Sequence, residues 1–165
     1  MKKGISELLF QGFLGDIKTG SDINGFKCRD LEQYQVQDGD IPSLFKFNYD
    51  KGEYDISCLN GIIIGISIKF DIDLDALHKV EIEEKKFDLG YKANFVDFAM
   101  FLNQINVQWE FDKIDTGQKS IGMLLPSKTK VMYSFEKDFF GFYQVVNFNL
   151  QLYNSIRASN SPDLF

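Results

Sequence analysis

Residues 44–70 read LFKFNYDKGEYDISCLNGIIIGISIKF, and this stretch decides the fold. Apolar and polar residues alternate along 44–49 and again along 54–58, which is the period of a strand with one buried face. The residues DKGE at 50–53 separate these strands as a turn, and Asn60-Gly61 favours the two positive φ angles of a type I′ turn before a third strand. The stretch therefore predicts a three-stranded antiparallel meander.

The third strand of this meander is unusually apolar. Strict alternation puts one set of side chains on a single face, namely Ile62, Ile64, Ile66, Ile68 and Phe70. Ile63 then lies on the other face beside Gly65, which indicates a strand that is partly covered on both sides. We therefore expect this strand to lie in the centre of a sheet.

The C-terminal half repeats the pattern of strands. Alternation predicts strands over 107–112, 131–135 and 146–152, with a further strand at 120–125 that Pro126 closes. Asn94 is placed to cap a helix over 95–106, and a weaker helix is expected after Ser21. These elements define a single α+β domain over 1–153, built mainly of antiparallel β-meanders with one or two helices packed on the sheet. Residues 154–165 are expected to form a frayed tail.

Each half thus reads as a helix followed by a meander, which suggests the hypothesis that the chain contains two related α-β-β-β halves. The tripeptides Ile64-Gly65-Ile66 and Phe140-Gly141-Phe142 are the only local correspondence that supports a duplication. Any two meanders of strand-rich sequence would share some of this likeness, so independent origin stays open.

Charge is distributed unevenly along the chain. The formal net charge is −6, and residues 1–90 carry eleven Lys/Arg against seventeen Asp/Glu, whereas residues 91–165 carry seven of each. An acidic chain without a dense basic cluster repels phosphate backbones, so direct binding to nucleic acid is disfavoured. The same field would attract a basic protein partner. The simpler interpretation is that the acidity only keeps the protein soluble.

The sequence favours a cytoplasmic protein. Lys2 and Lys3 open the chain, but Gly12, Gly15 and Asp16 interrupt the apolar run that a signal peptide needs. The longest apolar run spans seven residues, 62–68, far short of the roughly 18 of a membrane span. No membrane association is therefore expected.

The two cysteines, Cys28 and Cys58, could pair, although we expect both to be reduced in the cytosol. His78 is the only histidine, so triads and sites with several histidines are not available. A Cys thiolate paired with His78 remains formally possible, but Cys58 shares a strand face with apolar residues, where a thiol is inert. We expect no catalytic residue and no cofactor.

The string DIDLD at 71–75 superficially resembles the start of a calcium loop. Such a loop would need Gly at 76 and Glu at 82, where the sequence has Ala76 and Ile82, so no metal site is expected. In an extended segment these carboxylates project to one face as an acidic stripe. Two further acids extend the stripe and a third is a weaker member; the predicted partner-binding set is Asp71, Asp73, Asp75, Glu81, Glu83 and Glu84. The alternative is a solvated outer face that protects a sheet edge.

Aromatic side chains supply a second set of candidates. Phe139 and Phe140 follow a predicted turn, and adjacent strand residues face opposite sides, so both cannot enter the same core. We therefore predict that they contact a partner. Trp109 is expected to pack in the core.

The layout resembles that of the small immunity proteins of bacterial toxin systems, including those of contact-dependent growth inhibition. The resemblance rests on the opening GFLGDIKTGS at 12–21, on the meander that ends GIIIGISI at 61–68, and on the second helix and meander. It implies a protein that binds one cognate toxin domain, often a nuclease, and blocks or distorts its active site. It carries no specific motif, so no functional residue is transferred from it.

Together these observations predict a non-enzymatic immunity protein that blocks a basic toxin domain, expected to be a nuclease, through an acidic surface. Carboxylates on a rigid sheet would mimic the charge of a nuclease substrate and accelerate association. Two alternatives stay open. One is a carboxylate-based hydrolase, and the other is a non-catalytic scaffold or assembly module that associates through its aromatics.

Overall fold

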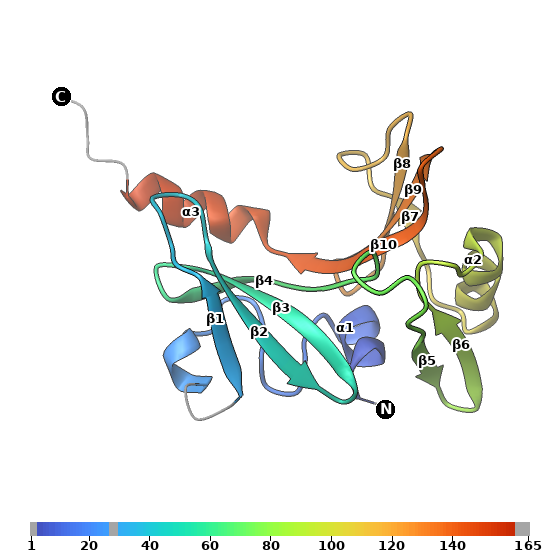
Figure 1. Ribbon diagram of the computed structural model, residues 1–165, viewed down its shortest axis with the longest axis horizontal. Coiled ribbons are helices and arrows are strands. Elements are labelled where there is room, and N and C mark those ends of the chain that lie inside the picture. Colours follow the sequence, from blue (N-terminus) through green and yellow to red (C-terminus); the bar gives the residue numbers. More distant parts are fainter. Residues whose placement is uncertain (1–2, 27–29, 161–165) are drawn as a thin grey trace.

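The computed structural model describes residues 3–26 and 30–160, and it has the α+β architecture with antiparallel meanders that the sequence predicts (Figure 1). Eight strands form one antiparallel sheet and two more form a separate hairpin. The first-half strands of the sheet are β1 (Leu31–Gln35), β2 (Ser43–Tyr49), β3 (Gly52–Leu59) and β4 (Ile62–Lys69). Those of the second half are β7 (Glu110–Phe111), β8 (Ser120–Leu124), β9 (Thr129–Glu136) and β10 (Phe139–Phe148).

The meander predicted over 44–70 is confirmed as strands β2, β3 and β4. Asp50 and Lys51 both have positive φ, 44° and 66°, and so do Asn60 and Gly61, at 52° and 78°. Each turn thus has two central residues with the backbone twist that suits a tight hairpin. Strand β4 lies in the centre of the sheet, as expected, with β3 on one side and β10 on the other.

The predicted facing of β4 is wrong at its start because the strand carries a bulge. Ser57 pairs with Gly65 while Cys58 pairs with Ile63, so Ile64 is the extra residue. The bulge reverses the alternation. Ile63 therefore joins Ile66 in the main core, whereas Ile64 is buried outside that cluster.

Helix α2 (Phe95–Gln104) is the predicted second-half helix, and Asn94 caps it by accepting a hydrogen bond from the backbone N–H of Asp97 at 3.1 Å. It packs Phe98, Phe101 and Leu102 into the core. The weaker helix expected after Ser21 is only a 3₁₀ turn, η1 (Ile23–Phe26). The helix α1 (Ile5–Gln11) and the hairpin of β5 (His78–Ile82) with β6 (Lys85–Leu89) were not predicted.

The C-terminal segment corrects two expectations. The strand predicted over 146–152 ends at Phe148, and residues that were expected to fray form helix α3 (Leu150–Asn160). Asn149 explains the change, because its side-chain oxygen accepts the N–H of Leu152 at 2.9 Å and starts the helix. The predicted tail at 161–165 lies outside the described residues.

The strand predicted over 107–112 is reduced to Glu110–Phe111. Trp109 precedes it, half-buried, and donates its indole N–H to the side-chain oxygen of Asn103 at 3.2 Å. It packs against the core, as expected, with its ring 6.4 Å from that of Phe95. The preceding residues 107–108 belong to no strand, and the backbone N–H of Val107 donates to the carbonyl of Leu102 at 2.9 Å, so alternation alone overestimated the strand.

The strand order β1-β2-β3-β4-β10-β9-β8-β7 places the last strand of each half at the centre. Ladder registers connect one residue from each strand into a single row across the sheet, on the face opposite the main core. The row runs Glu32, Lys46, Asp55, Ser67, Val146, Lys130, Leu124 and Glu110. Ser67 and Val146 form its midpoint, so the halves are arranged about an approximate two-fold axis. A duplication remains a prediction that this arrangement favours.

Two further features bear on the earlier expectations. Cys58 is a fully buried free thiol, and burial raises its pKa to about 12, which leaves it unreactive at neutral pH. Cys28 lies outside the described residues. None of the helices within 3–26 and 30–160 is long and apolar enough to cross a membrane.

Candidate functional site

The segment 71–77, which we call the acidic loop, connects β4 to β5 and forms bends and a turn where an extended stripe was expected. The backbone N–H of Ala76 donates to the carbonyl of Asp73 at 3.3 Å, and that of Asp75 donates to the Asp73 side chain at 3.1 Å. Asp73 thus bonds its own turn, as Asp often does. The prediction of a period-two stripe is therefore wrong, although Asp71, Asp73 and Asp75 are all exposed.

The acidic loop also exposes apolar side chains. Ile72 is 71% exposed, Leu74 43% and Leu77 57%. Isolated exposed apolar residues are ordinary, but three within seven residues that also carry three carboxylates form a mixed surface suited to a protein contact. This composition is the main feature of the site.

The loop is held in place at several points. Lys92 forms an ion pair with Asp75, and a side chain at Gly90 would collide with the Ala76 carbonyl, so the two backbones lie in direct contact. His78 follows the loop and stacks on Phe70 with ring centroids 5.4 Å apart. Burial lowers the pKa of His78, with Asp73 acting weakly in the opposite direction, so the ring is neutral at pH 7.

The remaining predicted acids do not join this loop. Glu83 and Glu84 form the turn at the far end of the β5–β6 hairpin, with Glu83 at φ 53°. Glu81 is half-buried on β5, where it lies 3.5 Å from the Lys86 amine and its backbone N–H donates to Ser6 at 2.9 Å. The five-residue strand β5 separates these acids from the loop, so the expected continuous stripe is broken.

Of the two predicted aromatics, Phe139 is linked to the acidic loop through residues 90–92, and Phe140 is not. The Tyr91 ring lies 5.5 Å from that of Phe139, and the Tyr91 carbonyl lies against the Gly141 backbone. Phe140 is 56% exposed on the opposite face of β10, where it pairs with Phe135. The expected exposure of Phe140 is confirmed, whereas Phe139 is half-buried against Tyr91 and Tyr143.

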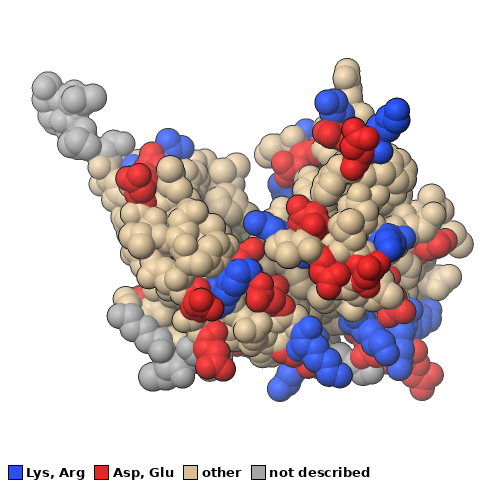
Figure 2. All heavy atoms as spheres, in the orientation of Figure 1, with Lys and Arg blue, Asp and Glu red and all other residues tan. Residues whose placement is uncertain are grey.

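A cluster around Asp55 borders the loop. Asp55 is 8% exposed; it accepts the Tyr34 hydroxyl at 2.7 Å and lies 3.9 and 3.8 Å from the amines of Lys46 and Lys69. A small pocket of about 190 Å³ separates this cluster from the loop, and Asp73 lines its other side. The acids of the first half are therefore partly neutralised by neighbouring lysines. Figure 2 accordingly shows interspersed acidic and basic side chains on this face.

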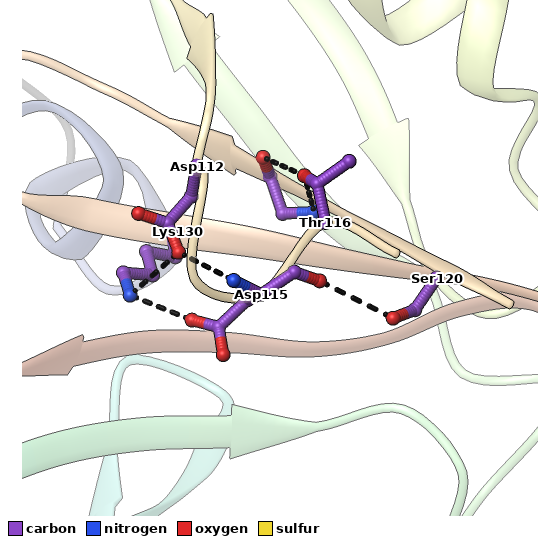
Figure 3. Close-up of polar contacts among 6 residues, drawn as sticks. Asp112, Asp115, Thr116, Ser120 and Lys130 are labelled. Carbon is purple, nitrogen blue, oxygen red and sulfur yellow. Dashed lines mark hydrogen bonds and ion pairs between the residues drawn. The ribbon is translucent and has the colours of Figure 1, made fainter. Parts of the chain in front are cut away.

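A second charged cluster lies in the other half, around Lys130 on β9 (Figure 3). Its amine donates to Asp112 at 2.9 Å and to Asp115 at 2.6 Å, and Asp112 also accepts the backbone N–H of Asp115 at 2.9 Å. Thr116 and Ser120 close the same loop by hydrogen bonds to the backbone of Gly122 and Asp115.

The pKa values in this second cluster follow from its hydrogen bonds. Burial alone would raise the pKa of Asp112, but the bonds from Lys130 and Asp115 outweigh burial and hold it below its usual value. Burial likewise opposes the charge of Lys130, yet the two carboxylates raise its pKa. Both groups are charged at neutral pH, so the cluster is a stable ion triad that fixes the β7–β8 loop.

Sequence reasoning missed both clusters because neither has a local spacing. Asp112 and Lys130 are 18 positions apart, and Tyr34 and Asp55 are 21 apart. Only the register of the sheet brings them together. The exposed apolar residues of the acidic loop did have a signal, since Ile72 and Leu74 stand between aspartates, but sequence reasoning considered only the acids of this segment as a binding surface.

The scan against protein-family models found no match, and the searches of curated proteins and of solved structures found none either. No group of three or more His, Cys, Asp or Glu side chains able to hold a metal ion occurs within 3–26 and 30–160.

Proposed function

We propose that this protein is an immunity protein that binds a basic toxin domain and blocks it, with the acidic loop at the centre of the contact. The observation that carries the proposal is the composition of that loop. Three carboxylates and three exposed apolar side chains project from one short segment whose backbone is fixed at both ends.

The chemistry of such a loop suits a basic partner. A nuclease active site attracts phosphate and is therefore lined by cationic side chains, which the aspartates would meet in place of substrate. Ile72, Leu74 and Leu77 would supply the apolar contact that excludes water from the charged pairs. Charge steers association, and the apolar contact slows dissociation.

Rigidity supports the same proposal. The Asp75–Lys92 ion pair and the close approach of Ala76 to Gly90 fix the loop before binding, so less conformational entropy is lost on association. Phe139 extends the surface through Tyr91, as an anchor at its margin, whereas Phe140 is exposed on the other face of β10 and would need a second contact with the partner. Glu81, Glu83 and Glu84 lie toward the far end of the β5–β6 hairpin and would act at long range, by steering.

The proposal includes a cytoplasmic location, where a toxin that has entered the cell would be met, and no cofactor. It also includes no direct contact with nucleic acid, since the loop repels phosphate. The nuclease activity of the partner is part of the proposal and rests on the resemblance to immunity proteins.

An assembly module is the second candidate, and the exposed aromatic rings favour it. Phe111, Phe135 and Phe140 are 52%, 40% and 56% exposed, and the rings of Phe135 and Phe140 lie 5.9 Å apart. Self-association through them would make the apparent mass in light scattering rise with concentration and fall back to the monomer in Phe140→Ser. A hydrolase is less favoured, because Asp112 and Asp115 share Lys130 and the lowered pKa of Asp112 makes it a poor general acid.

Affinity capture from the native cells tests the proposal. The tagged protein is compared with a loop variant, Asp71→Asn/Asp73→Asn/Asp75→Asn, which keeps the side-chain oxygen that bonds the turn. The matched control is Glu83→Gln/Glu84→Gln, which removes two charges from the hairpin end. We expect one stoichiometric basic protein with the wild type and the control, and its loss with the loop variant. Equal capture by the loop variant would contradict the proposal. So would the absence of a basic partner from cells shown to express the candidate toxins encoded by neighbouring genes.

A further inference from the structure

A pocket of about 550 Å³ opens on the other side of His78 from the Asp55 cluster. Its walls come from three parts of the chain: the start of α1, the β2–β3 turn and strand β5. Ile5 and Leu77 supply apolar walls, while Tyr54 and His78 also line it. The volume falls within the range of small-molecule sites.

The rim of this pocket is cationic although the chain is acidic. Lys3, Lys51 and Lys79 line it, one from each of those three parts, and all three are exposed. Asp50 and Glu81 are the acids of the lining, so three positive charges face two negative ones. Glu81 is already engaged by Lys86 at 3.5 Å. In a chain of net charge −6 this is a local reversal of sign, and Lys and Arg gather along the corresponding lower edge in Figure 2.

Tyr54 gives the pocket a polar group that the fold leaves unused. The side chain is 1% exposed and its hydroxyl forms no hydrogen bond with another residue within 3–26 and 30–160, but the oxygen is not a fully buried unsatisfied atom and so still reaches the surface. Burial raises its pKa, and the nearby charges of Asp50 and Glu7 raise it further, so the hydroxyl keeps its proton and acts as a donor.

Two glycines keep the space at this hydroxyl open. A Cβ added at Gly52 would lie 2.9 Å from the Tyr54 oxygen, and one added at Gly4 would lie 3.3 Å from it. Gly4 has φ 71°, a conformation that favours glycine, whereas Gly52 does not need positive φ. The absence of a side chain at Gly52 is therefore explained by the approach of the Tyr54 ring, which leaves its hydroxyl facing the pocket.

We propose that this pocket binds a small phosphate-bearing molecule. The Tyr54 hydroxyl donates to a phosphate oxygen, and Lys3, Lys51 and Lys79 balance its charge. Ile5 and Leu77 contact the apolar part of the molecule, and the neutral His78 ring in the pocket lining offers an N–H donor. This proposal does not depend on the proposed function, because the acidic loop contributes only Leu77 to the pocket.

Calorimetric titration with inorganic phosphate, at constant ionic strength against sodium chloride, tests the site. The variants are Tyr54→Phe, which removes only the hydroxyl, and Lys51→Asn, which removes a charge while keeping a residue that tolerates positive φ. The matched control is Lys113→Ala, an exposed lysine in the β7–β8 loop outside the pocket lining. Thermal unfolding of each variant verifies that it is folded.

We expect saturable binding of phosphate by the wild type and by Lys113→Ala. Affinity should fall by about tenfold or more in Tyr54→Phe, the range for a hydrogen bond to a charged group. It should fall by about threefold in Lys51→Asn, in line with an exposed charge. Absence of saturable binding by the wild type would overturn the proposal, and so would an unchanged affinity in folded Tyr54→Phe or tighter binding of acetate than of phosphate.

Discussion

The two halves of the sheet have the same strand order but place opposite charges at equivalent points. Asp55 on β3 and Lys130 on β9 each lie one strand from the midpoint pair of Ser67 and Val146, in the same row and on the same face. Asp55 lies between two lysines at 3.8 and 3.9 Å, whereas Lys130 lies between two aspartates at 2.9 and 2.6 Å. The shorter contacts of the second half hold a long loop, while those of the first half hold only neighbouring strands.

This difference shows how one strand order supports two surfaces. In the second half the ion triad draws the β7–β8 loop over the sheet and covers it. In the first half the lysines contact Asp55 and Glu53 on neighbouring strands, and the nearby acidic loop stays exposed. The closed cluster therefore stabilises the fold, and the open one borders the proposed contact surface.

The largest expected effect is a difference in the free energy of unfolding between alanine substitutions at Gly141 and Gly65, the two glycines of the central strands. Gly141→Ala should destabilise the protein by about 3 kcal/mol, because its φ of 152° is unfavourable for alanine and the new Cβ would strike the Tyr91 carbonyl. Gly65→Ala should cost only about 1 kcal/mol, since the Cβ meets the ring edge of the half-exposed Phe148. Urea unfolding measures both. Equal costs would refute this contrast between the halves.

The next effect concerns the two lysine clusters. Lys130→Met should cost about 3 kcal/mol, because it leaves the largely buried Asp112 carboxylate without its cation. Lys46→Met should cost less than about 1 kcal/mol, because Asp55 keeps Lys69 and the Tyr34 hydroxyl. Free energies of unfolding from urea titration provide the test. A larger loss of stability in Lys46→Met than in Lys130→Met would show that the Asp55 cluster, and not the Lys130 cluster, stabilises the fold.

A smaller effect appears in the pH dependence. The folded pKa of Asp112 lies below the unfolded value, so its stabilisation is present above about pH 4 and disappears as the pH falls through the folded pKa. Asp112→Asn cannot show this loss. The stability difference between wild type and Asp112→Asn, measured by urea unfolding from pH 7 to pH 2, should shrink by about 1 kcal/mol at the acid end. A constant difference would show that the carboxylate is not stabilised by folding.

The smallest effect is expected at Asp55. Asp55→Asn keeps an acceptor for the Tyr34 hydroxyl and loses only contacts near 4 Å to lysines that are partly exposed, so we expect a cost of about 0.5 to 1 kcal/mol. High salt should reduce this cost. Thermal unfolding at low and high sodium chloride measures it, and a cost that does not depend on salt would point to packing.

Local patterns predicted the meanders well because they depend on neighbours in sequence. Alternation defined β2, β3 and β9, the Asn60-Gly61 pair identified a turn, and Asn94 marked the start of α2. The bulge at Ile64 was not predictable, since it is a property of the pairing between β3 and β4. The alternation that continued to Leu152 was misleading because the Asn149 cap outweighed it.

The candidate site was predicted in composition and missed in shape. The sequence singled out the acids at 71, 73 and 75 and Phe140, and all of these residues are exposed. The turn at Asp73 replaces the expected stripe, however, and Ile72 is exposed as well. The distance from this loop to Glu83 depends on a hairpin that was not predicted, although Val80 and Ile82 alternate with Lys79 and Glu81 along β5. The acids of this segment were assigned to the stripe instead. The contact between the loop and Phe139, through Tyr91, is tertiary and has no local signature.

Neutralisation in cells tests the central claim most directly. The basic protein recovered by capture is expressed alone and then together with the wild type, with the variant Asp71→Asn/Asp73→Asn/Asp75→Asn, or with the control Glu83→Gln/Glu84→Gln, at equal levels of folded protein. Growth is measured in each case. We predict growth arrest with the partner alone, rescue by the wild type and the control, and failure of the loop variant to rescue. A partner that is harmless alone, or full rescue by the loop variant, would contradict the claim that this loop neutralises a toxin.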